Sequence, residues 1–253
     1  GFIFERLLNI YKAHGMVTKN LSEHARGLAA FAQSPLSEYF NHYKGNLKKK
    51  LSNTEVSPDV TGPRRYKQLA DIVRFYKPST ILETGTWNGG RAVEMALAAF
   101  ESKDKVHYIG FDLFEEATEE SDAYEMNSKA HNMVEAVEKR LQDFAVRMIK
   151  TGKELTFELH KGDSKKTLPA CERLKDADFA YIDGGHSYET VKADWEAVKK
   201  HIPVVVFDDF FSKDKEGNLP KEEHLGVNKL MKEIEAYGKI VLPSADGVLG
   251  GGI

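Results

Sequence analysis

The sequence predicts an α/β protein in which a doubly wound, mostly parallel sheet carries an N-terminal helical cap. After residue 63, short and nearly continuous apolar runs alternate with stretches of helical periodicity, as buried parallel strands and their crossover helices require. The first of these runs ends in an acid and a glycine-rich turn, Glu83–Gly90. Residues 1–62 instead show apolar residues at helical spacing followed by a polar, proline-containing loop. We therefore divide the chain into a helical cap or lid, 1–62, and one domain, 63–253.

The elements expected after residue 63 follow from periodicity and length. A helix with apolar residues three and four positions apart comes first and ends before Pro78. Strands are expected at 80–83, 106–111, 155–159, 179–182 and 204–207. Helices are expected at 91–100, about 128–151, 187–200 and 225–237. The acidic stretch Leu113–Asn127 is expected to be an irregular insertion over the carboxyl edge of the sheet.

Bulk composition favours a globular enzyme of the cytoplasm. The 253 residues suit one large domain with an appendage, and a net charge of −3 gives no sign of a nucleic-acid partner. Cys171 is the only cysteine, so neither an intrachain disulfide nor a cluster of thiolates can form, and a reducing compartment is expected. No apolar run is long enough for a membrane span, and no secretory leader is seen. Because the chain starts at Gly1 rather than at a methionine, we expect that its natural start has been removed.

The glycine-rich turn after the first strand is the most informative motif. Gly85 can take backbone angles that are closed to other residues, and it lets a ligand lie against the main chain. The following helix offers N–H groups that suit a carboxylate or a phosphate. A dinucleotide site requires the spacing G-x-G-x-x-G, whereas here the glycines follow Glu83 as G-x-x-x-G-G. The turn therefore predicts a nucleoside-like ligand, but not a nicotinamide dinucleotide.

The next two strands also end in residues that suit such a ligand. Ligands of open α/β sheets bind outside the carboxyl ends of the strands, and Asp112 stands at the end of the second strand. A carboxylate at this position accepts both hydrogen bonds of a ribose diol. The third strand runs into Gly162-Asp163-Ser164, which is either a generic turn or part of the same ligand site.

Three carboxylates follow the fourth and fifth strands. Asp183 ends one strand, while the adjacent Asp208 and Asp209 end the next. Carboxylates that converge without a cation repel one another and raise one another's pKa values, whereas Mg²⁺ would relieve this repulsion. The alternative, that these aspartates only cap helices, explains the adjacent pair poorly. We therefore favour a divalent metal site formed by these three residues.

His186 is the most attractive candidate for a general base because the pKa of an unperturbed imidazole lies near neutrality. Two alternatives stay open. The histidine after Gly184-Gly185 is equally suited to a structural role, such as binding a backbone carbonyl. Asp183 competes with it for the role of base.

Several motifs in this order resemble a known family. The pattern E-x-G-x-x-x-G at Glu83–Gly89 resembles motif I of the class I S-adenosylmethionine (AdoMet) methyltransferases. The run I-D-G-G-H-S-Y-E at 182–189, then Asp194-Trp195, then V-V-F-D-D at 205–209 resembles the metal-dependent small-molecule O-methyltransferases. That branch, methyltransferase family 24, includes enzymes that methylate sugar hydroxyls of macrolides and lies near the Mg²⁺-dependent catechol O-methyltransferases.

The resemblance implies a fold and a set of ligand contacts. The fold would be a Rossmann-like, seven-stranded sheet with Lys239–Leu242 as the sixth strand and Val248–Ile253 as the start of the seventh. Because the seventh strand is incomplete, we expect either that the natural chain continues past Ile253 or that this edge of the sheet is frayed. Asp163 would bind the exocyclic amine of adenine, and the N–H of Ser164 a ring nitrogen. The cofactor-binding residues would be Glu83, Gly85, Thr86, Asn88, Gly89, Asp112, Asp163, Ser164 and Asp183. The metal ligands would be Asp183, Asp208 and Asp209, and the catalytic residues Asp183 and His186.

The expected function is therefore Mg²⁺-assisted, AdoMet-dependent O-methylation of a small-molecule hydroxyl, on a sugar, a phenol or a peptide. One alternative is a hydroxylase-like enzyme on the same scaffold, related to oxygenases of cephalosporin biosynthesis. Another is a binding protein that keeps the AdoMet pocket without methylating anything. Tyr188 and Lys192 match the Tyr-x-x-x-Lys spacing of short-chain dehydrogenases, but without the matching glycine turn. The N-terminal helices are a candidate contact for a homo-oligomer.

Overall fold

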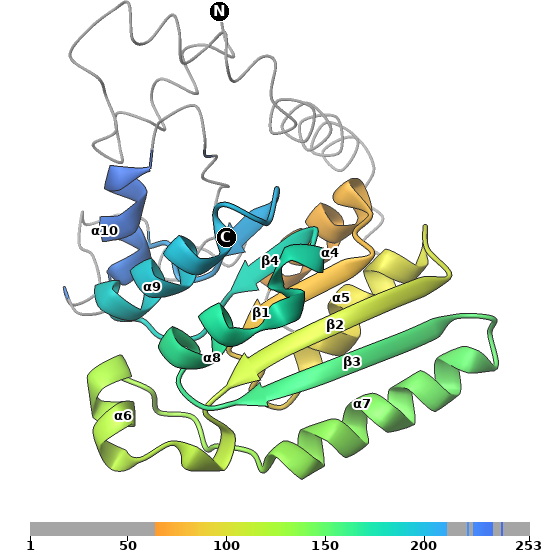
Figure 1. Cartoon of the computed structure of the whole chain (residues 1–253), viewed down its shortest axis with the longest axis horizontal. Coiled ribbons are helices and arrows are strands. Elements are labelled where there is room, and N and C mark those ends of the chain that lie inside the picture. Colours follow the sequence, from red (N-terminus) through yellow and green to blue (C-terminus); the bar gives the residue numbers. More distant parts are fainter. Residues whose placement is uncertain (1–63, 212–221, 223–224, 235–238, 240–253) are drawn as a thin grey trace, which may run out of the picture.

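A single parallel sheet organises the part of the chain that this computed structural model describes, which comprises residues 64–211, 222, 225–234 and 239. Every neighbouring pair of strands in it is parallel, and the spatial order is β3-β2-β1-β4-β5 (Figure 1). The strands are β1 (Thr80–Thr84), β2 (Lys105–Asp112), β3 (Glu154–Lys161), β4 (Phe179–Ile182) and β5 (Val205–Phe207). The order reverses direction at β1, so the switch point that binds ligands in such folds lies between β1 and β4.

The helices agree with the expected alternation, with two corrections. They are α4 (Arg64–Tyr76), α5 (Gly90–Phe100), α6 (Glu119–Glu125), α7 (Val134–Ile149), α8 (Ser164–Ala170), α9 (Tyr188–Val198) and α10 (Gly226–Glu233), with 3₁₀ turns η1 (Phe114–Glu116) and η2 (Glu172–Asp176). The expectation of an irregular stretch at 113–127 is wrong, because η1 and α6 lie within it. Helix α7 begins several residues later than expected, at Val134, whose N–H donates to the Glu115 carboxylate at 2.9 Å.

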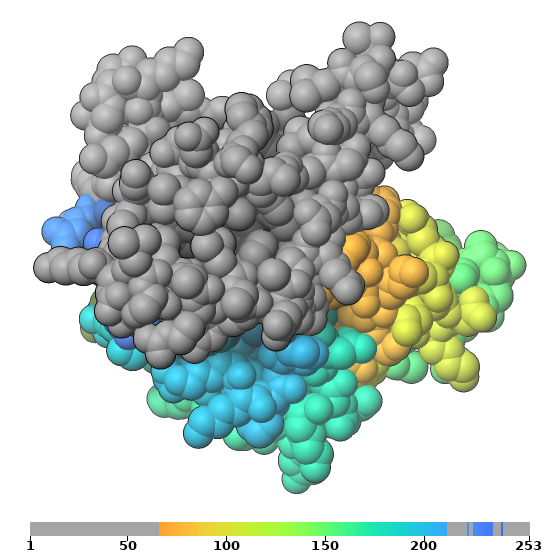
Figure 2. All heavy atoms as spheres, turned by 90° about the horizontal axis from the view of Figure 1, so that it is seen from above, coloured from red at the N-terminus to blue at the C-terminus, as the bar shows by residue number. Residues whose placement is uncertain are grey.

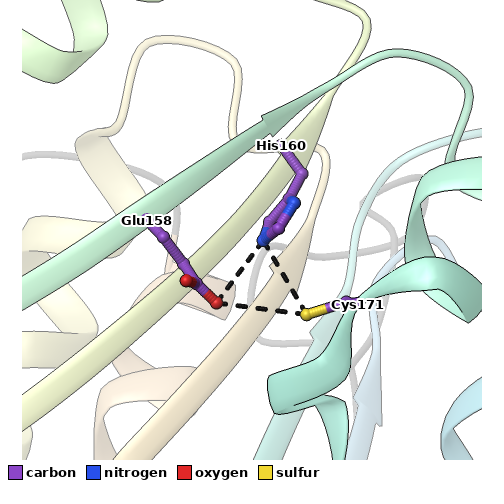
Figure 3. Close-up of side chains that lie close together, drawn as sticks. All are labelled: Glu158, His160 and Cys171. Carbon is purple, nitrogen blue, oxygen red and sulfur yellow. Dashed lines mark hydrogen bonds and ion pairs between the residues drawn. The ribbon is translucent and has the colours of Figure 1, made fainter.

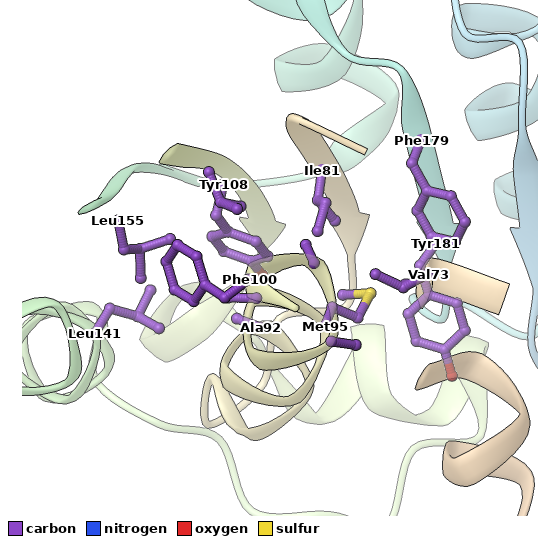
Figure 4. Close-up of a cluster of buried hydrophobic side chains, with 14 of the residues drawn as sticks. Val73, Ile81, Ala92, Met95, Phe100, Tyr108, Leu141, Leu155, Phe179 and Tyr181 are labelled. Atoms are coloured by element: carbon purple, nitrogen blue, oxygen red, sulfur yellow. The ribbon is translucent and has the colours of Figure 1, made fainter. Parts of the chain in front are cut away.

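The first face of the sheet is covered by α4, α5 and α7. Their apolar sides meet strand residues that point to this face, and the residues in contact are nearly all inaccessible to solvent (Figure 4). Met95 of α5 and Leu141 of α7 have no exposed surface, and neither has Phe179 of β4. Figure 2 shows α4 and α5, in orange and yellow, on the opposite side of the described part from the later strands and helices in cyan and blue.

The second face is covered by α8, η2, α9 and α10. Strand residues alternate in direction, so Leu82, Ile109 and Phe111 point to this face while their neighbours point to the first. They pack against Leu168 of α8 and Val198 of α9. The result is a three-layer α/β/α arrangement that leaves the carboxyl ends of the strands at one edge, where α6 also lies (Figure 1).

Some expectations fall outside the described residues. These are the helical cap at 1–62, the sixth strand beyond Lys239 and the beginning of the seventh strand at Val248–Ile253. The described sheet therefore has five strands. Within the same described residues, no helix combines the length and the apolar character that crossing a membrane requires.

Candidate active site at the carboxyl ends of the strands

The glycine turn after β1 fits closely against the end of β4. Gly85 has a φ of 87°, and a Cβ built on it would lie 2.0 Å from the carbonyl oxygen of Asp183. The Gly85 N–H donates to the Phe111 carbonyl at 2.8 Å, and the Asp183 N–H donates to the Thr84 carbonyl at 2.9 Å. Glycine is therefore required at this position for both its backbone angle and its size. The ends of β1, β2 and β4 meet at this one point.

Glu83 lies beneath the turn rather than at its surface. It is completely buried, and the Tyr108 hydroxyl donates to its Oε2. Burial raises the pKa of Glu83 to about 8. The hydroxyl of Thr86 is also used inside the protein, because it lies 3.0 Å from the Tyr108 hydroxyl. A ligand on the turn would therefore meet the main chain of Thr86, with the buried Glu83 beneath it.

Asp112, at the end of β2, is held in place by the main chain. Its Oδ2 accepts the Trp87 N–H at 2.8 Å and its Oδ1 accepts the Phe114 N–H at 2.7 Å. These bonds join the end of β2 to the glycine turn and fix the direction of the carboxylate. The side chain is only partly buried, and each of its oxygens has a second lone pair that can accept a further hydrogen bond.

The start of α5 is shaped by the side chain of Asn88. Its Oδ1 accepts the Gly90 N–H at 2.9 Å, and its carbonyl accepts a bond from Arg140 of α7 at 2.8 Å. Gly89 precedes the helix in the left-handed conformation, with a φ of 73°. The guanidinium of Arg91, in the first turn of α5, lies 3.6 Å above the Tyr66 ring.

Asp163 and Ser164 begin α8, as expected for a turn after the third strand. The Asp163 carboxylate accepts the Lys165 N–H at 3.0 Å and so caps the helix. Ser164 is close to Asp194, a residue of α9 that is 1% exposed and to which the sequence assigned no role. Burial raises the pKa of Asp194 to about 6, although the hydroxyls of Ser164 and Thr84 lower it.

The three aspartates that were predicted to bind a metal are near neighbours. Burial, followed by the negative charges of Asp208 and Asp209, raises the pKa of Asp183 well above its ordinary value. Asp208 is 1% exposed and accepts bonds from the Tyr181 hydroxyl at 2.7 Å and from the Asp209 N–H at 2.9 Å. Among the described residues, only Glu158, His160 and Cys171 form a group of three possible metal ligands whose donor atoms all lie within 4.8 Å of one another. The carboxylates of Asp183, Asp208 and Asp209 do not meet this condition.

His186 uses both ring nitrogens in contacts within the protein. Its Nδ1 bonds the backbone carbonyl of Glu125, and its Nε2 lies 3.0 Å from Oδ2 of Asp209. A carbonyl only accepts, so Nδ1 carries a proton and Nε2 is the atom that gains or loses one. The bond to Asp209 raises the pKa of His186, although burial lowers it. The structure thus combines the structural contact considered for His186 with a setting suited to a base.

Glu125, at the end of α6, is a residue that the sequence reasoning missed. Its carboxylate accepts bonds from the Ser187 N–H at 2.8 Å, the Ser187 hydroxyl at 2.9 Å and the Thr190 hydroxyl. With the contact from its carbonyl to His186, Glu125 joins the insertion to the loop after β4. The sequence did contain a signal for the start of α6, because Thr118 and Ser121 form the capping box of this helix.

Tyr188 and Lys192, which have the spacing of a dehydrogenase pair, contact α10. The Lys192 ammonium donates to the Tyr188 hydroxyl at 2.7 Å and to Glu233 at 2.9 Å, and the Tyr188 hydroxyl also bonds Glu233. The three side chains therefore connect α9 with α10. This contact accounts for the pair without a dehydrogenase site.

Comparison with known families agrees with this geometry. The sequence model of one family, described as a methyltransferase domain of methyltransferase family 24, matches residues 82–210. This range begins inside β1 and ends just after Asp208 and Asp209, so it contains every residue predicted for the candidate site. A search of curated proteins found no match.

The fold is shared with a solved structure at low sequence identity. The apo structure of CalS11, a TDP-rhamnose 3′-O-methyltransferase of calicheamicin biosynthesis, is similar over 87% of this chain and 94% of that chain, with 19% identity and a TM-score of 0.52. The O-methyltransferase TomG from Streptomyces achromogenes, in complex with SAM, is similar over 98% of this chain and 96% of that chain, with 16% identity and a TM-score of 0.49.

Proposed function

This chain belongs to the family of methyltransferase domains that matches residues 82–210 and is an AdoMet-dependent methyltransferase, and from that premise we propose that it methylates a hydroxyl oxygen of a small molecule. The observation that carries the proposal is the meeting of Gly85, Asp112 and Asp183 at one edge of the sheet. Asp112, Gly85 and Asp183 follow the strand order β2-β1-β4, which is the order in which the ribose, the methionine end of AdoMet and the acceptor would lie.

The proposed cofactor site uses three strand ends. The main chain of the turn from Gly85 to Gly89 would hold the methionine end of AdoMet, with the buried Glu83 beneath it. Asp112 would accept the ribose hydroxyls, since two main-chain bonds already fix its direction. Asp163 and Ser164 would face the adenine. AdoMet carries its own leaving group, so the protein's main contribution to the rate is to align the acceptor oxygen with the methyl group.

His186 is proposed as the base that takes the proton of the acceptor hydroxyl. The proton would arrive at Nε2, because Nδ1 is held by the Glu125 carbonyl. Asp209, 3.0 Å away, stabilises the imidazolium that results. Asp183 remains the competing candidate, since a carboxyl whose pKa is raised is a stronger base than an ordinary one.

The chemistry of three neighbouring carboxylates also suits a divalent cation. Asp183, Asp208 and Asp209 would hold it, because a cation would offset the repulsion among their negative charges. This repulsion is part of the reason that the pKa of Asp183 is raised. An all-oxygen donor set of this kind suits Mg²⁺. When bound, such an ion would lower the pKa of the acceptor hydroxyl.

Calorimetric titration of AdoMet, with and without Mg²⁺, tests the proposal. We expect the wild type to bind AdoMet and the Asp112→Asn variant to bind it at least about tenfold more weakly, because two charge-assisted bonds to the ribose are weakened. Asp143→Asn is the matched control, since Asp143 pairs with Lys139 on the exposed side of α7. Equal affinity of wild type and Asp112→Asn would contradict the ribose assignment.

The reaction itself is tested by transfer of labelled methyl groups to a panel of sugars, phenols and peptides. Two results together would support the full proposal. The rate of methyl transfer to oxygen should rise with Mg²⁺ in the wild type, and it should fall when Asp208 and Asp209 are both replaced by Asn. Turnover that depends on iron and 2-oxoglutarate instead would favour the hydroxylase-like alternative. AdoMet binding without any transfer would favour a binding protein.

A further inference from the structure

Three metal-binding side chains meet on the second face of the sheet, on residues that the candidate active site does not use. Glu158 and His160 are two positions apart on β3, so both point to the same face. Cys171, between α8 and η2, lies over them (Figure 3). The cysteine is 8% exposed, whereas the side chains of Glu158 and His160 are 31% and 30% exposed. An ion could therefore reach the group from solvent.

The spacing of the three donor atoms is that of ligands around one ion. The Nε2 of His160 lies 3.4 Å from Oε1 of Glu158 and 3.7 Å from Sγ of Cys171, and Sγ lies 4.0 Å from Oε1. Ligands on a tetrahedral Zn²⁺ with its usual bond lengths are about 3.3–3.6 Å apart. The pair of nitrogen and oxygen already has this separation, and the two distances to sulfur exceed it by only a few tenths of an ångström.

Hydrogen bonding alone accounts poorly for this arrangement. A nitrogen–oxygen distance of 3.4 Å is long for a hydrogen bond, and sulfur is a weak partner at 3.7 and 4.0 Å. The imidazole is positioned instead by its ring, which stacks on Phe111 with centroids 4.6 Å apart and an angle of 11° between the planes. The three donors are thus brought together by packing and converge without strong bonds among themselves.

We propose that Glu158, His160 and Cys171 bind one Zn²⁺ ion through Oε1, Nε2 and Sγ, with water in the fourth position. Thiolate and imidazole ligands favour Zn²⁺ over Mg²⁺ and Ca²⁺, which take oxygen. One thiolate and one carboxylate balance the charge of the ion. The single cysteine of the chain excludes a cluster of thiolates but not this mixed set.

The proposed ion ties the outer strand of the described sheet to the segment that follows α8. That strand, β3, pairs only with β2 in the described sheet, so a bond from Glu158 and His160 to Cys171 adds a fixed point on its second face. Asp163 and Cys171 cap the two ends of helix α8, so the ion would also fix the far end of the helix whose start is proposed to face adenine. Glu158, His160 and Cys171 all lie outside the set of residues that form the proposed methyltransferase site.

Binding of Zn²⁺ and Co²⁺ to the metal-free full chain tests the proposal. We expect one Zn²⁺ per chain by calorimetry and mass spectrometry of the folded protein, with release of protons as the thiol ionises. Co²⁺ should show the near-ultraviolet absorption of a thiolate–cobalt bond. Cys171→Ser should abolish that absorption, and His160→Gln and Glu158→Gln should each weaken Zn²⁺ binding by about tenfold or more.

Three matched variants make the test specific. Glu154→Gln changes an exposed glutamate of the same strand, and His201→Gln changes an exposed histidine after α9. Asp209→Asn changes the proposed Mg²⁺ site. All three should bind Zn²⁺ as the wild type does. Absence of stoichiometric Zn²⁺ binding by the wild type would overturn the proposal. Unchanged binding by Cys171→Ser would overturn it as well, because serine is close in size to cysteine and should leave the fold of the protein intact.

Discussion

Gly85 shows how much one residue decides at the edge of the sheet. Its positive φ disfavours any side chain, and the carbonyl of Asp183 occupies the place where a Cβ would lie. Because Gly85 has no side chain, the turn can pack directly against the end of β4. A larger residue would therefore disturb the proposed cofactor site and the acidic cluster at once.

We expect Gly85→Ala to bind AdoMet at least about tenfold more weakly than the wild type and to lose stability beyond the cost of backbone strain alone, about 1–2 kcal/mol. Gly152→Ala is the control: Gly152 has a φ of 78°, but a Cβ there would meet no atom within 4 Å. Calorimetry and urea unfolding measure both quantities. Equal losses in the two variants would show that the contact with Asp183 has no role of its own.

His186 and Asp209 form the pair whose charge should govern the pH dependence of the reaction. Since Asp209 raises the pKa of His186, Asp209→Asn should lower that pKa. A base must be unprotonated to act, so the fall of kcat/KM on the acidic side should move to lower pH in this variant.

The control for that profile is Asp122→Asn. Asp122 lies 2.8 Å from Nε2 of His131, in a similar pair that does not include His186. Its replacement should leave the pH–rate profile unchanged. A profile that does not move with Asp209→Asn would remove His186 as the base and leave Asp183 as the candidate.

At the scale of elements, α6 is the part that the sequence predicted least well. The acidic composition of 113–127 indicated a solvated irregular insertion, yet its capping box starts a helix and its last residue, Glu125, contacts the loop after β4. Periodicity could not reveal α6, because this helix has no buried residues and therefore no apolar stripe. The strands, in contrast, were predicted within one or two residues, since buried parallel strands are distinct apolar runs.

Glu125→Gln tests whether α6 positions His186. It removes the charge that accepts bonds from Ser187 and Thr190, so we expect kcat to fall by about tenfold while the affinity for AdoMet changes less than twofold. Hydrogen exchange of residues 184–190 should become faster. Glu120→Gln, on the exposed side of the same helix, should change none of these measurements. Parallel losses of AdoMet affinity and kcat would indicate a general disturbance of the fold.

At the scale of the whole molecule, the sequence predicted which residues follow the strand ends better than it predicted their contacts. Asp112, Asp183, Asp208 and Asp209 lie at the carboxyl edge because parallel strands all end there. The sequence did not reveal that Glu83 and Thr86 point inward to Tyr108, since that contact depends on the register between β1 and β2. Pairing between strands is a long-range property that local patterns do not specify.

Glu83 should make the stability of the whole domain depend on pH. In the unfolded chain its pKa is near its ordinary value of 4.5, whereas in the folded protein burial raises it to about 8. Between these values the folded state holds a proton that the unfolded state has lost, so the contribution of Glu83 is full below pH 4.5 and is lost as the pH rises toward 8.

The free energy of unfolding of the wild type should therefore fall relative to that of Glu83→Gln, by roughly 1.4 kcal/mol per pH unit within that window. Urea unfolding from pH 5 to pH 8 measures the difference. Glu138→Gln, exposed on α7, is the control and should stay parallel to the wild type. A constant difference between wild type and Glu83→Gln across the range would contradict the raised pKa.

Trp87 gives this protein a built-in optical reporter. The chain has 2 tryptophans: Trp87, 42% exposed, follows Gly85 and Thr86, and its Nε1 donates to the Ala130 carbonyl at 2.9 Å, while Trp195 packs on Phe207 across the second face. In a Trp195→Phe variant the remaining indole emission would come from the glycine turn alone. Occupation of that turn could then be followed in real time, by light, with the protein carrying no added dye.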